Sequence, residues 1–149
     1  MRRSLLFAIF LLVLSCGGGK YQNAATEALS HTEKLRYEQY MIQGQQLYTT
    51  HCSNCHQEDG SGLGRLIPPL AQSDYLLSNR DRTLCIIKHG LEEKIIVNGE
   101  DYQQAMPGNP SLSDIEIAQI ATFIYNSWGH ELGYMAVKDI SPTLDTCQK

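Results

Sequence analysis

The residues best suited to chemistry form one run, Cys52-Ser53-Asn54-Cys55-His56. Two thiols three positions apart can each add to one of the two vinyl groups of a single porphyrin, and the next residue, His56, is then placed under the iron as proximal ligand. In an exported protein, a C-x-x-C-H run is the attachment site of a c-type haem. The run therefore predicts one covalently bound haem c, anchored by Cys52 and Cys55.

Two other kinds of site use a C-x-x-C pair, namely zinc sites and thioredoxin-like redox pairs. A zinc site needs a second Cys or His pair at comparable spacing, but Cys85 and Cys147 are isolated from each other and from any close histidine. A thioredoxin-like motif follows a strand, whereas the residues before Cys52 have a helical pattern. Both alternatives fit the sequence less well than haem.

The amino terminus has the features of an export signal. Arg2 and Arg3 precede an apolar run from Leu5 to Leu14. A bilayer span needs about 20 apolar residues, so this run is too short to cross a membrane, but it has the length of a signal-peptide core. The following Val13-Leu14-Ser15-Cys16 resembles the lipobox of bacterial lipoproteins, which implies cleavage before Cys16 and acylation of its thiol. An ordinary signal peptide with a coincidental cysteine is the alternative.

The remaining cysteines follow from this assignment. The chain has five cysteines. With Cys16 acylated and Cys52 and Cys55 on haem, Cys85 and Cys147 are left. In an oxidising compartment outside the cytoplasm this pair can form a disulfide. The alternative is that Cys85, in an apolar helical context, is a buried free thiol. The sequence does not give the distance between the two residues, so both interpretations stay open.

The chain divides into four segments, expected as a signal peptide (1–15), a lipid-anchored flexible tether (16–36), a haem domain (37–129) and an extension with little periodicity (130–149). A flexible coil of the tether's length reaches about 20 to 25 Å from a bilayer. Removal of the signal peptide takes away two arginines and no acids, so the formal charge changes from −4 to −6. An acidic surface argues against nucleic acid and suggests partners with a basic docking patch, although solubility alone also explains it.

Two helices are expected at the ends of the haem domain. Ser30 and Glu33 form a capping-box pattern before a stripe of mostly apolar residues spaced three and four apart: Tyr37, Tyr40, Met41, Gly44, Leu47, Tyr48 and His51. Gly44 in that stripe costs up to about 1 kcal/mol relative to Ala, which predicts close approach of another helix. The expected partner is a helix of about four turns that begins with the capping box Ser113–Glu116 and ends at Gly129.

The region between these helices is expected to be short elements and loops. A Gly-rich loop at 57–66 and a stiff Ile67-Pro68-Pro69-Leu70 segment precede short helices at 73–78 and 81–89, the second stopped by Gly90. Asn98-Gly99 predicts a tight hairpin turn. Residues 105–108 are expected to form an irregular loop.

Together these residues resemble the class I (mitochondrial-type) cytochromes c over residues 38–129. Gly44 and Tyr48 match the small and aromatic positions of that family's amino-terminal helix, and Ile120 and Phe123 match the carboxy-terminal helix. The segments around Asn98, Met106 and Trp128 resemble bacterial c-type domains found as small soluble cytochromes or fused to larger oxidoreductases. The resemblance implies an all-α fold whose helices pack around one covalently attached haem, with a small hairpin or loop before the distal methionine.

The resemblance also implies roles for single residues. The Pro68 carbonyl would accept a hydrogen bond from His56 Nδ1, although Pro68 can equally be a loop stiffener. Tyr102 would contact the cofactor. Met106, about 50 residues after His56, would be the distal iron ligand.

Other residues compete with Met106 for the distal position. Methionine is more often a core residue than a ligand. Met41 lies on the helical stripe and Met135 lies in the extension. His51 and His89 have adequate surface or capping roles, which leaves His130 as the remaining histidine candidate.

Methionine and histidine ligation fills both axial positions of the iron and raises its reduction potential. The expected function is therefore electron transfer rather than enzymatic catalysis. The protein would be anchored to a bacterial cell membrane, facing the periplasm, and would pass single electrons from a quinol-oxidising complex or dehydrogenase to a terminal oxidase or reductase. One alternative is a haem sensor or peroxidase-like enzyme with an open iron site, and another is an electron-transfer subunit of a larger oxidoreductase complex.

Overall fold

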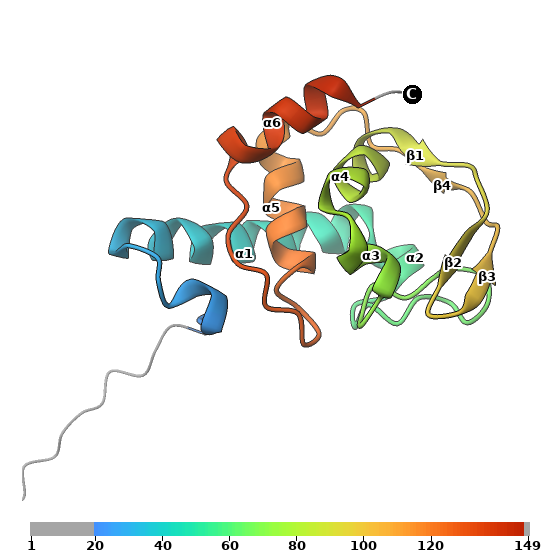
Figure 1. The fold of residues 1–149 in the computed structure, drawn as a ribbon, viewed down its shortest axis with the longest axis horizontal. Helices are drawn as coiled ribbons and strands as arrows, with labels where there is room; N and C mark the ends of the chain where they lie inside the picture. The colour runs from blue at the N-terminus through green and yellow to red at the C-terminus, as the bar shows by residue number, and fades with distance from the viewer. Residues whose placement is uncertain (1–19, 148–149) are drawn as a thin grey trace, which may run out of the picture.

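The computed structural model describes residues 20–147. The predicted signal peptide and Cys16 lie outside the described residues. Within 20–147 no helix combines the length and apolar character that crossing a membrane requires. The described chain is mostly helical, as predicted, with a long amino-terminal helix crossed by a shorter helix from the carboxy-terminal half (Figure 1).

Helices α1 (His31–His51) and α5 (Asp114–Ile124) both begin with the predicted capping boxes. At α1, the Ser30 hydroxyl accepts from the Glu33 backbone N–H at 3.3 Å, and the Glu33 carboxylate accepts from the Ser30 N–H at 2.9 Å. At α5, the Glu116 carboxylate accepts from the Ser113 N–H at 2.8 Å. These bonds satisfy backbone donors that the first helical turn leaves without intrahelical partners, so both helices start where the sequence predicts.

The two helices meet at Gly44, as predicted. A Cβ atom added there would fall on the backbone carbonyl of Gln119 and within 2.8 Å of Phe123 Cβ. The helix backbones therefore touch, which no residue larger than glycine permits in this geometry. Side chains from both helices form the core around this contact: Tyr37, Met41, Tyr48, Ile117, Ile120 and Ile124.

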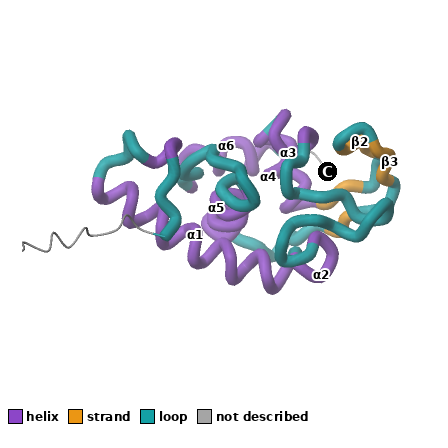
Figure 2. Tube along the Cα trace, turned by 90° about the horizontal axis from the view of Figure 1, so that it is seen from below, coloured by secondary structure: helices purple, strands orange, loops and turns teal. Residues whose placement is uncertain are grey.

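Short elements connect the two long helices. They are α2 (Ser53–His56), α3 (Asp74–Ser78), α4 (Arg80–His89), β1 (Gly90–Leu91), β2 (Ile95–Val97), β3 (Glu100–Tyr102) and β4 (Met106–Pro107). Strands β2 and β3 form the predicted hairpin, with Asn98 and Gly99 in the left-handed region at φ 52° and 82°. Residues 105–108 do not form the expected irregular loop throughout, because Met106–Pro107 pairs as a short strand with β1, which lies far away in the sequence. Figure 2 shows these strands grouped at one end of the molecule.

The carboxy-terminal extension is folded, contrary to the expectation of a segment with little periodicity. Helix α5 ends at Ile124, short of Gly129, and a further helix, α6 (Val137–Thr146), lies across α4 and α5 (Figure 1). Ile140 and Leu144 of α6 are each 3% exposed. Only these two positions are deeply buried, and Pro142 lies between them, so the helical pattern is weak in the sequence.

The predicted disulfide is present. Cys85 in α4 and Cys147 after α6 are bonded, with their Cα atoms 5.4 Å apart. The alternative of a buried free thiol at Cys85 is therefore wrong. The bridge joins residues 62 positions apart and fastens the carboxy-terminal end of α6 to α4.

The described part of the predicted tether also differs from the expectation. A short 3-10 helix, η1 (Ala24–Thr26), precedes α1, and Thr26 is 1% exposed. Asn23 Nδ2 donates to Asn126 Oδ1 at 3.0 Å, which joins the start of the described chain to the segment after α5. From Asn23 onward the segment is part of the folded domain. Most of its side chains are small or polar, so no sustained apolar pattern indicated this packing.

Substituting Gly44 tests the helix contact. Gly44→Ala improves intrinsic helix propensity but forces α1 and α5 apart, and overpacking of this kind costs about 1–3 kcal/mol. We expect the free energy of unfolding to fall by that amount in chemical denaturation of the haem-loaded protein. The control is Gln43→Ala, an exposed position one residue earlier. Equal stability of the Gly44 variant and wild type would show that the helix contact is not tight.

Candidate functional site

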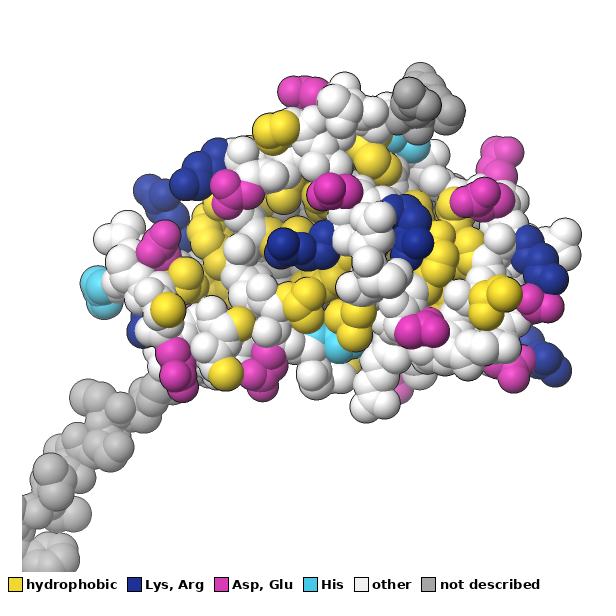
Figure 3. All heavy atoms as spheres, in the orientation of Figure 1, with side chains coloured by type: hydrophobic (Ala, Val, Ile, Leu, Met, Phe, Trp, Pro, Cys, Tyr) yellow, Lys and Arg dark blue, Asp and Glu magenta, His cyan; other side chains and the backbone are white. Residues whose placement is uncertain are grey.

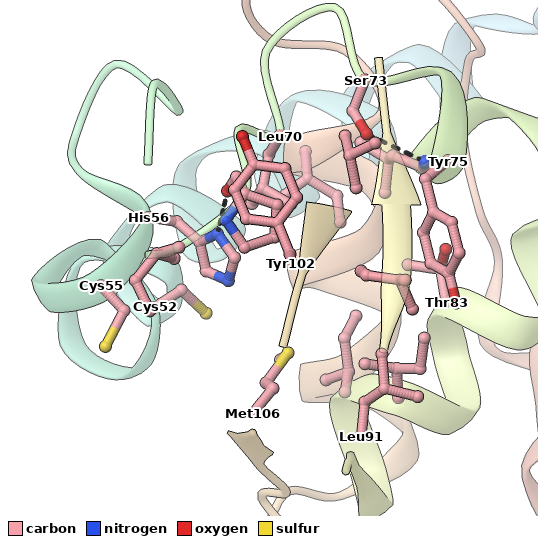
Figure 4. A pocket seen from close by; sticks show the side chains of 18 of the residues that line it. Cys52, Cys55, His56, Leu70, Ser73, Tyr75, Thr83, Leu91, Tyr102 and Met106 are labelled. Carbon is pink, nitrogen blue, oxygen red and sulfur yellow. Dashed lines mark hydrogen bonds between the residues drawn. The ribbon is translucent and has the colours of Figure 1, made fainter. Parts of the chain in front are cut away.

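An open cavity lies between the end of α1, α2, the strands and α4. Cys52, Cys55, His56 and Met106 all face it, as Figure 4 shows in part. The rest of the wall is mainly apolar: Ile67, Pro68, Pro69, Leu70, Leu76, Ile86, Ile87, Leu91, Ile95, Val97, Ile120 and Ile124. Large apolar cavities with a few convergent polar groups are typical of cofactor sites.

The two thiols of the C-x-x-C-H run lie on one wall of the cavity. Helix α1 ends at His51 with Cys52 as its C-cap, and the chain continues into α2, where the His56 N–H bonds to the Cys52 carbonyl at 2.9 Å. Cys52 and Cys55 are not disulfide-bonded. Burial, and then the neighbouring Cys55, raises the pKa of the Cys52 thiol to about 11. Redox-active C-x-x-C pairs have lowered thiol pKa values, so the environment of Cys52 does not suit a thioredoxin-like pair.

The zinc alternative also lacks support in the described chain. Residues 20–147 contain no group of three or more His, Cys, Asp or Glu side chains arranged to hold a metal ion. A structural zinc site needs four such ligands. The thiols therefore have no partners for zinc binding within this part of the chain.

His56 is 8% exposed, and its ring is fixed by one hydrogen bond. Nδ1 donates to the Pro68 carbonyl at 3.1 Å, which is the contact that the family resemblance implied (Figure 4). Burial lowers the pKa of His56, against the opposing effect of this hydrogen bond, so the neutral ring is favoured. Because Nδ1 carries the hydrogen, Nε2 has a free lone pair, as an iron ligand requires.

The loop that carries Pro68 is held by backbone contacts. Gly60 O accepts from both the Leu70 and Ala71 N–H groups, at 2.8 and 3.0 Å. Gly62 lies so close that an added Cβ would come within 2.7 Å of the Pro68 carbonyl oxygen. These contacts fix the position of the hydrogen-bond acceptor that orients His56.

Met106 reaches the same cavity from β4. Its backbone pairs with Leu91 in β1, and in Figure 4 its sulfur and the His56 ring point toward the same open space. The competing methionines lie elsewhere, because Met41 and Met135 are 2% and 5% exposed within the core and do not line the cavity. The structure therefore brings together the two residues that the sequence predicted as axial ligands.

His130, the remaining histidine candidate, is used for another purpose. It is 6% exposed, Nδ1 donates to the Ile124 carbonyl at 3.1 Å, and Nε2 accepts from the Gln72 N–H at 3.0 Å. Both ring nitrogens are occupied, so His130 cannot act as a ligand in this conformation. It instead fixes Gln72, at φ 53°, near the end of the loop that carries Pro68. No sequence pattern indicated this role, because it joins residues 58 positions apart.

Tyr102 also lies where the resemblance implied. It is 7% exposed, lines the cavity, and donates from its hydroxyl to the Gly64 carbonyl at 3.4 Å. Ser73 and Thr83 are also buried and line the cavity, but they were not singled out from the sequence. The Ser73 hydroxyl accepts from the Leu76 N–H, and the Thr83 hydroxyl donates to the Asn79 carbonyl. In the sequence these residues therefore have the pattern of an ordinary helix cap and an ordinary helix interior.

These residues fit a haem c group. Two thiols, one neutral imidazole and one thioether converge on a cavity with a mainly apolar wall, and such donors suit covalent attachment and axial ligation of haem iron. A family model described as cytochrome c matches residues 41–128. The chain belongs to the cytochrome c family.

Two kinds of relative support this membership. Cytochrome c-552 of Thermus thermophilus is 32% identical over 90 residues, which cover 58% of this chain and 68% of the relative. The cytochrome c subunit of a quinone alcohol dehydrogenase from Gluconacetobacter polyoxogenes is 34% identical over 110 residues, covering 70% of this chain and 23% of the subunit. The corresponding subunit of Gluconobacter oxydans is 30% identical over 99 residues. The chain thus spans about a quarter of the length of the dehydrogenase subunits that it matches.

Family membership gives the chain its cofactor and its general class. It is an electron-transfer cytochrome with one covalently bound haem c. The alignment with the cytochrome c family also agrees with the mostly helical fold described above.

Substituting His130 tests its role in holding the Pro68 loop. His130→Leu leaves the part-buried Gln72 N–H and the buried Ile124 carbonyl without their partners, which costs about 1–3 kcal/mol. We expect that loss in the free energy of unfolding of the haem-loaded protein. His31→Leu, at an exposed histidine, is the matched control and should change stability by less than about 0.5 kcal/mol. Equal effects of the two substitutions would contradict the assigned role.

Proposed function

We propose that this cytochrome is a membrane-tethered one-electron carrier whose iron is ligated by His56 and Met106. The observation that carries the proposal is the convergence of the His56 imidazole and the Met106 thioether on the cavity that Cys52 and Cys55 border. With both axial positions filled, the iron has no open site for a substrate. Such a protein carries electrons and does not catalyse bond changes itself.

The chain's own residues would hold and tune the cofactor. Cys52 and Cys55 would anchor it, and the bond from His56 Nδ1 to Pro68 O maintains the tautomer in which Nε2 is free to act as an iron ligand. The apolar wall excludes water and lowers the local dielectric, and the thioether of Met106 favours a high reduction potential. The bound haem supplies the one-electron iron chemistry, and the protein supplies position and environment.

The proposed partners are redox proteins at a membrane. The donor would be a quinol-oxidising complex or a dehydrogenase, and the acceptor a terminal oxidase or reductase. The similarity to subunits of quinone alcohol dehydrogenases also supports a role as the electron-transfer subunit of a larger oxidoreductase complex.

Surface charge is consistent with a partner that has a basic docking patch. Glu92 and Glu93 are exposed beside the strands, and Glu93 borders the cavity. On the face that Figure 3 draws, acidic and basic side chains are interspersed, with apolar side chains between them. Redox encounters bury little surface, so we expect binding to be weak and short-lived.

The proposed location is the outer face of a bacterial cell membrane, with Cys16 as the lipid anchor. Two observations support export, namely the signal-like amino terminus and the Cys85–Cys147 disulfide, because disulfides persist in oxidising compartments. Residues 1–15 would then be removed, and several acyl chains on Cys16 would hold the protein stably where one chain would not.

Substituting Met106 tests the ligand assignment. In Met106→Leu the side-chain volume is nearly kept but the sulfur is lost, so we expect the weak red charge-transfer band of iron–methionine ligation to disappear and the reduction potential to fall. The measurement is an optical redox titration, which should follow a one-electron curve in wild type. Met41→Leu makes the same chemical change in the core and should keep the band. Retention of the band in Met106→Leu would assign the ligand elsewhere.

Substituting Cys16 tests the anchor. Cys16→Ser removes the only thiol in the lipobox-like run, so we expect the haem-loaded protein to leave the membrane fraction, while wild type stays in it and gains acyl mass in intact mass spectrometry. Ser15→Ala, one residue earlier, is the control and should stay membrane-bound. Wild-type protein without acyl mass would contradict the lipid anchor and would leave the electron-carrier assignment unaffected.

A further inference from the structure

Helix α6 is the largest described element that lies wholly outside the residues matched by the family model. That match ends at residue 128, and α6 begins at Val137. The helix nevertheless packs onto elements within the matched residues, because Ile140 and Leu144 are buried in the same core cluster as α4 and α5 residues. Figure 1 shows α6 lying across the ends of both helices. We therefore asked what this helix of the carboxy-terminal extension does for the haem site.

Helix α6 is fastened to the start and to the middle of α4. Near the start of α4, the Thr143 hydroxyl donates to Asp81 Oδ1 at 3.2 Å. In the middle of α4, Cys85 is bonded to Cys147. These two links, together with the buried face of α6, restrain α4 against movement away from the core.

A third link connects α6, α5 and the last turn of α4. The Ser141 hydroxyl donates to Asp114 Oδ2 at 2.7 Å, and Lys88 Nζ lies 3.3 Å from Asp114 Oδ1. The hydrogen bond from Ser141, and then the contacts with Lys88, hold the pKa of Asp114 below its usual value despite the opposing effect of desolvation. The carboxylate is therefore ionised at neutral pH and bonds to two helices at once.

The last turn of α4 is also what holds the Met106 segment. The Ile87 carbonyl accepts from the Asn109 N–H at 3.0 Å, and β1, which follows α4 directly, pairs Leu91 with Met106. Backbones are in close contact here, since a Cβ added to Gly108 would lie 2.7 Å from the Gly90 nitrogen. A displacement of the end of α4 must therefore move Met106 or break these backbone contacts.

We propose that α6 and the Cys85–Cys147 bridge form a positioning element for Met106. By holding α4 on the core, they keep β1 and β4 paired and the thioether at the cavity. This inference rests on the ligand role of Met106 proposed above. The carboxy-terminal extension would thereby keep Met106 in place at the cavity.

The test uses the full-length, haem-loaded protein and the double variant Cys85→Ser/Cys147→Ser, which removes the bridge without leaving a lone thiol. We expect amide hydrogen exchange of Asn109 and of β1 to become about ten-fold faster, while the amides of Tyr48 in α1 and of Cys52 just after it are unchanged. In optical titrations, the iron–methionine band should be lost at a lower alkaline pH than in wild type, and the reduction potential should fall.

Two further variants keep the test decisive if the double variant folds poorly. Ser141→Ala removes only the bond to Asp114 and should shift exchange of Asn109 in the same direction by a smaller factor. Thr26→Ala disturbs a buried residue at the other end of the molecule and should leave Asn109 exchange and the band unchanged.

The outcomes separate this inference from the ligand assignment. If only the amides of α6 exchange faster, while Asn109, the band and the potential stay as in wild type, α6 stabilises itself alone and the inference is wrong. If wild type lacks the band, the ligand role of Met106 fails. Hydrogen exchange at Asn109 then still reports whether α6 restrains the β4 segment, independently of the iron.

Discussion

The backbone contact between α1 and α5 at Gly44 is the constraint on which the rest of the structure depends. Because the helices touch there, the carboxy-terminal end of α1, which leads into Cys52 and His56, has a fixed place relative to α5. The next turn is fixed by aromatic packing, since the ring of Tyr48 lies 5.4 Å from that of Phe123 and 5.3 Å from that of Trp128. The Tyr48 hydroxyl then donates to the Gln57 carbonyl at 2.6 Å, just after α2. Contacts within the chain itself thus position the covalent attachment site.

The two axial positions depend on different parts of the chain. The proximal side is local, since His56 follows the anchoring cysteines and its acceptor, Pro68, is only 12 residues away. The distal side is assembled from segments far apart in sequence, because Met106 is held by β1 and α4, and α4 is held by α6. We therefore expect distal ligation to be the more easily disturbed of the two, as suits a site whose weaker ligand sets the reduction potential.

The parts of the fold that could be predicted from the sequence are those with local physical causes. The caps at Ser30 and Ser113 satisfy donors within one turn, Asn98-Gly99 tolerates positive φ, and Gly44 interrupts an apolar stripe for a packing reason. The run from Cys52 to His56 predicted residues that line the cavity. The family resemblance predicted the hydrogen bond between His56 and Pro68. Each of these signals depends on neighbours in the chain or on a recognisable motif.

The parts that could not be predicted are tertiary. The burial of α6 depends on two apolar residues around a proline, and the pairing of Met106 with Leu91 depends on α4 being in place. His130 had the residue type of a ligand, but its two hydrogen bonds to Ile124 and Gln72 exist only in the folded chain. The segment around Thr26 was expected to be flexible because small polar residues carry no periodic signal, yet it packs on the domain.

Binding of carbon monoxide to the reduced, full-length native protein tests the central claim most directly, because this ligand needs an open coordination position on the ferrous iron. If His56 and Met106 fill both axial positions, the optical spectrum of the reduced protein stays unchanged over seconds in buffer saturated with carbon monoxide. Rapid formation of a stoichiometric carbon monoxide complex would contradict the electron-carrier account and would favour a gas sensor or a peroxidase-like enzyme.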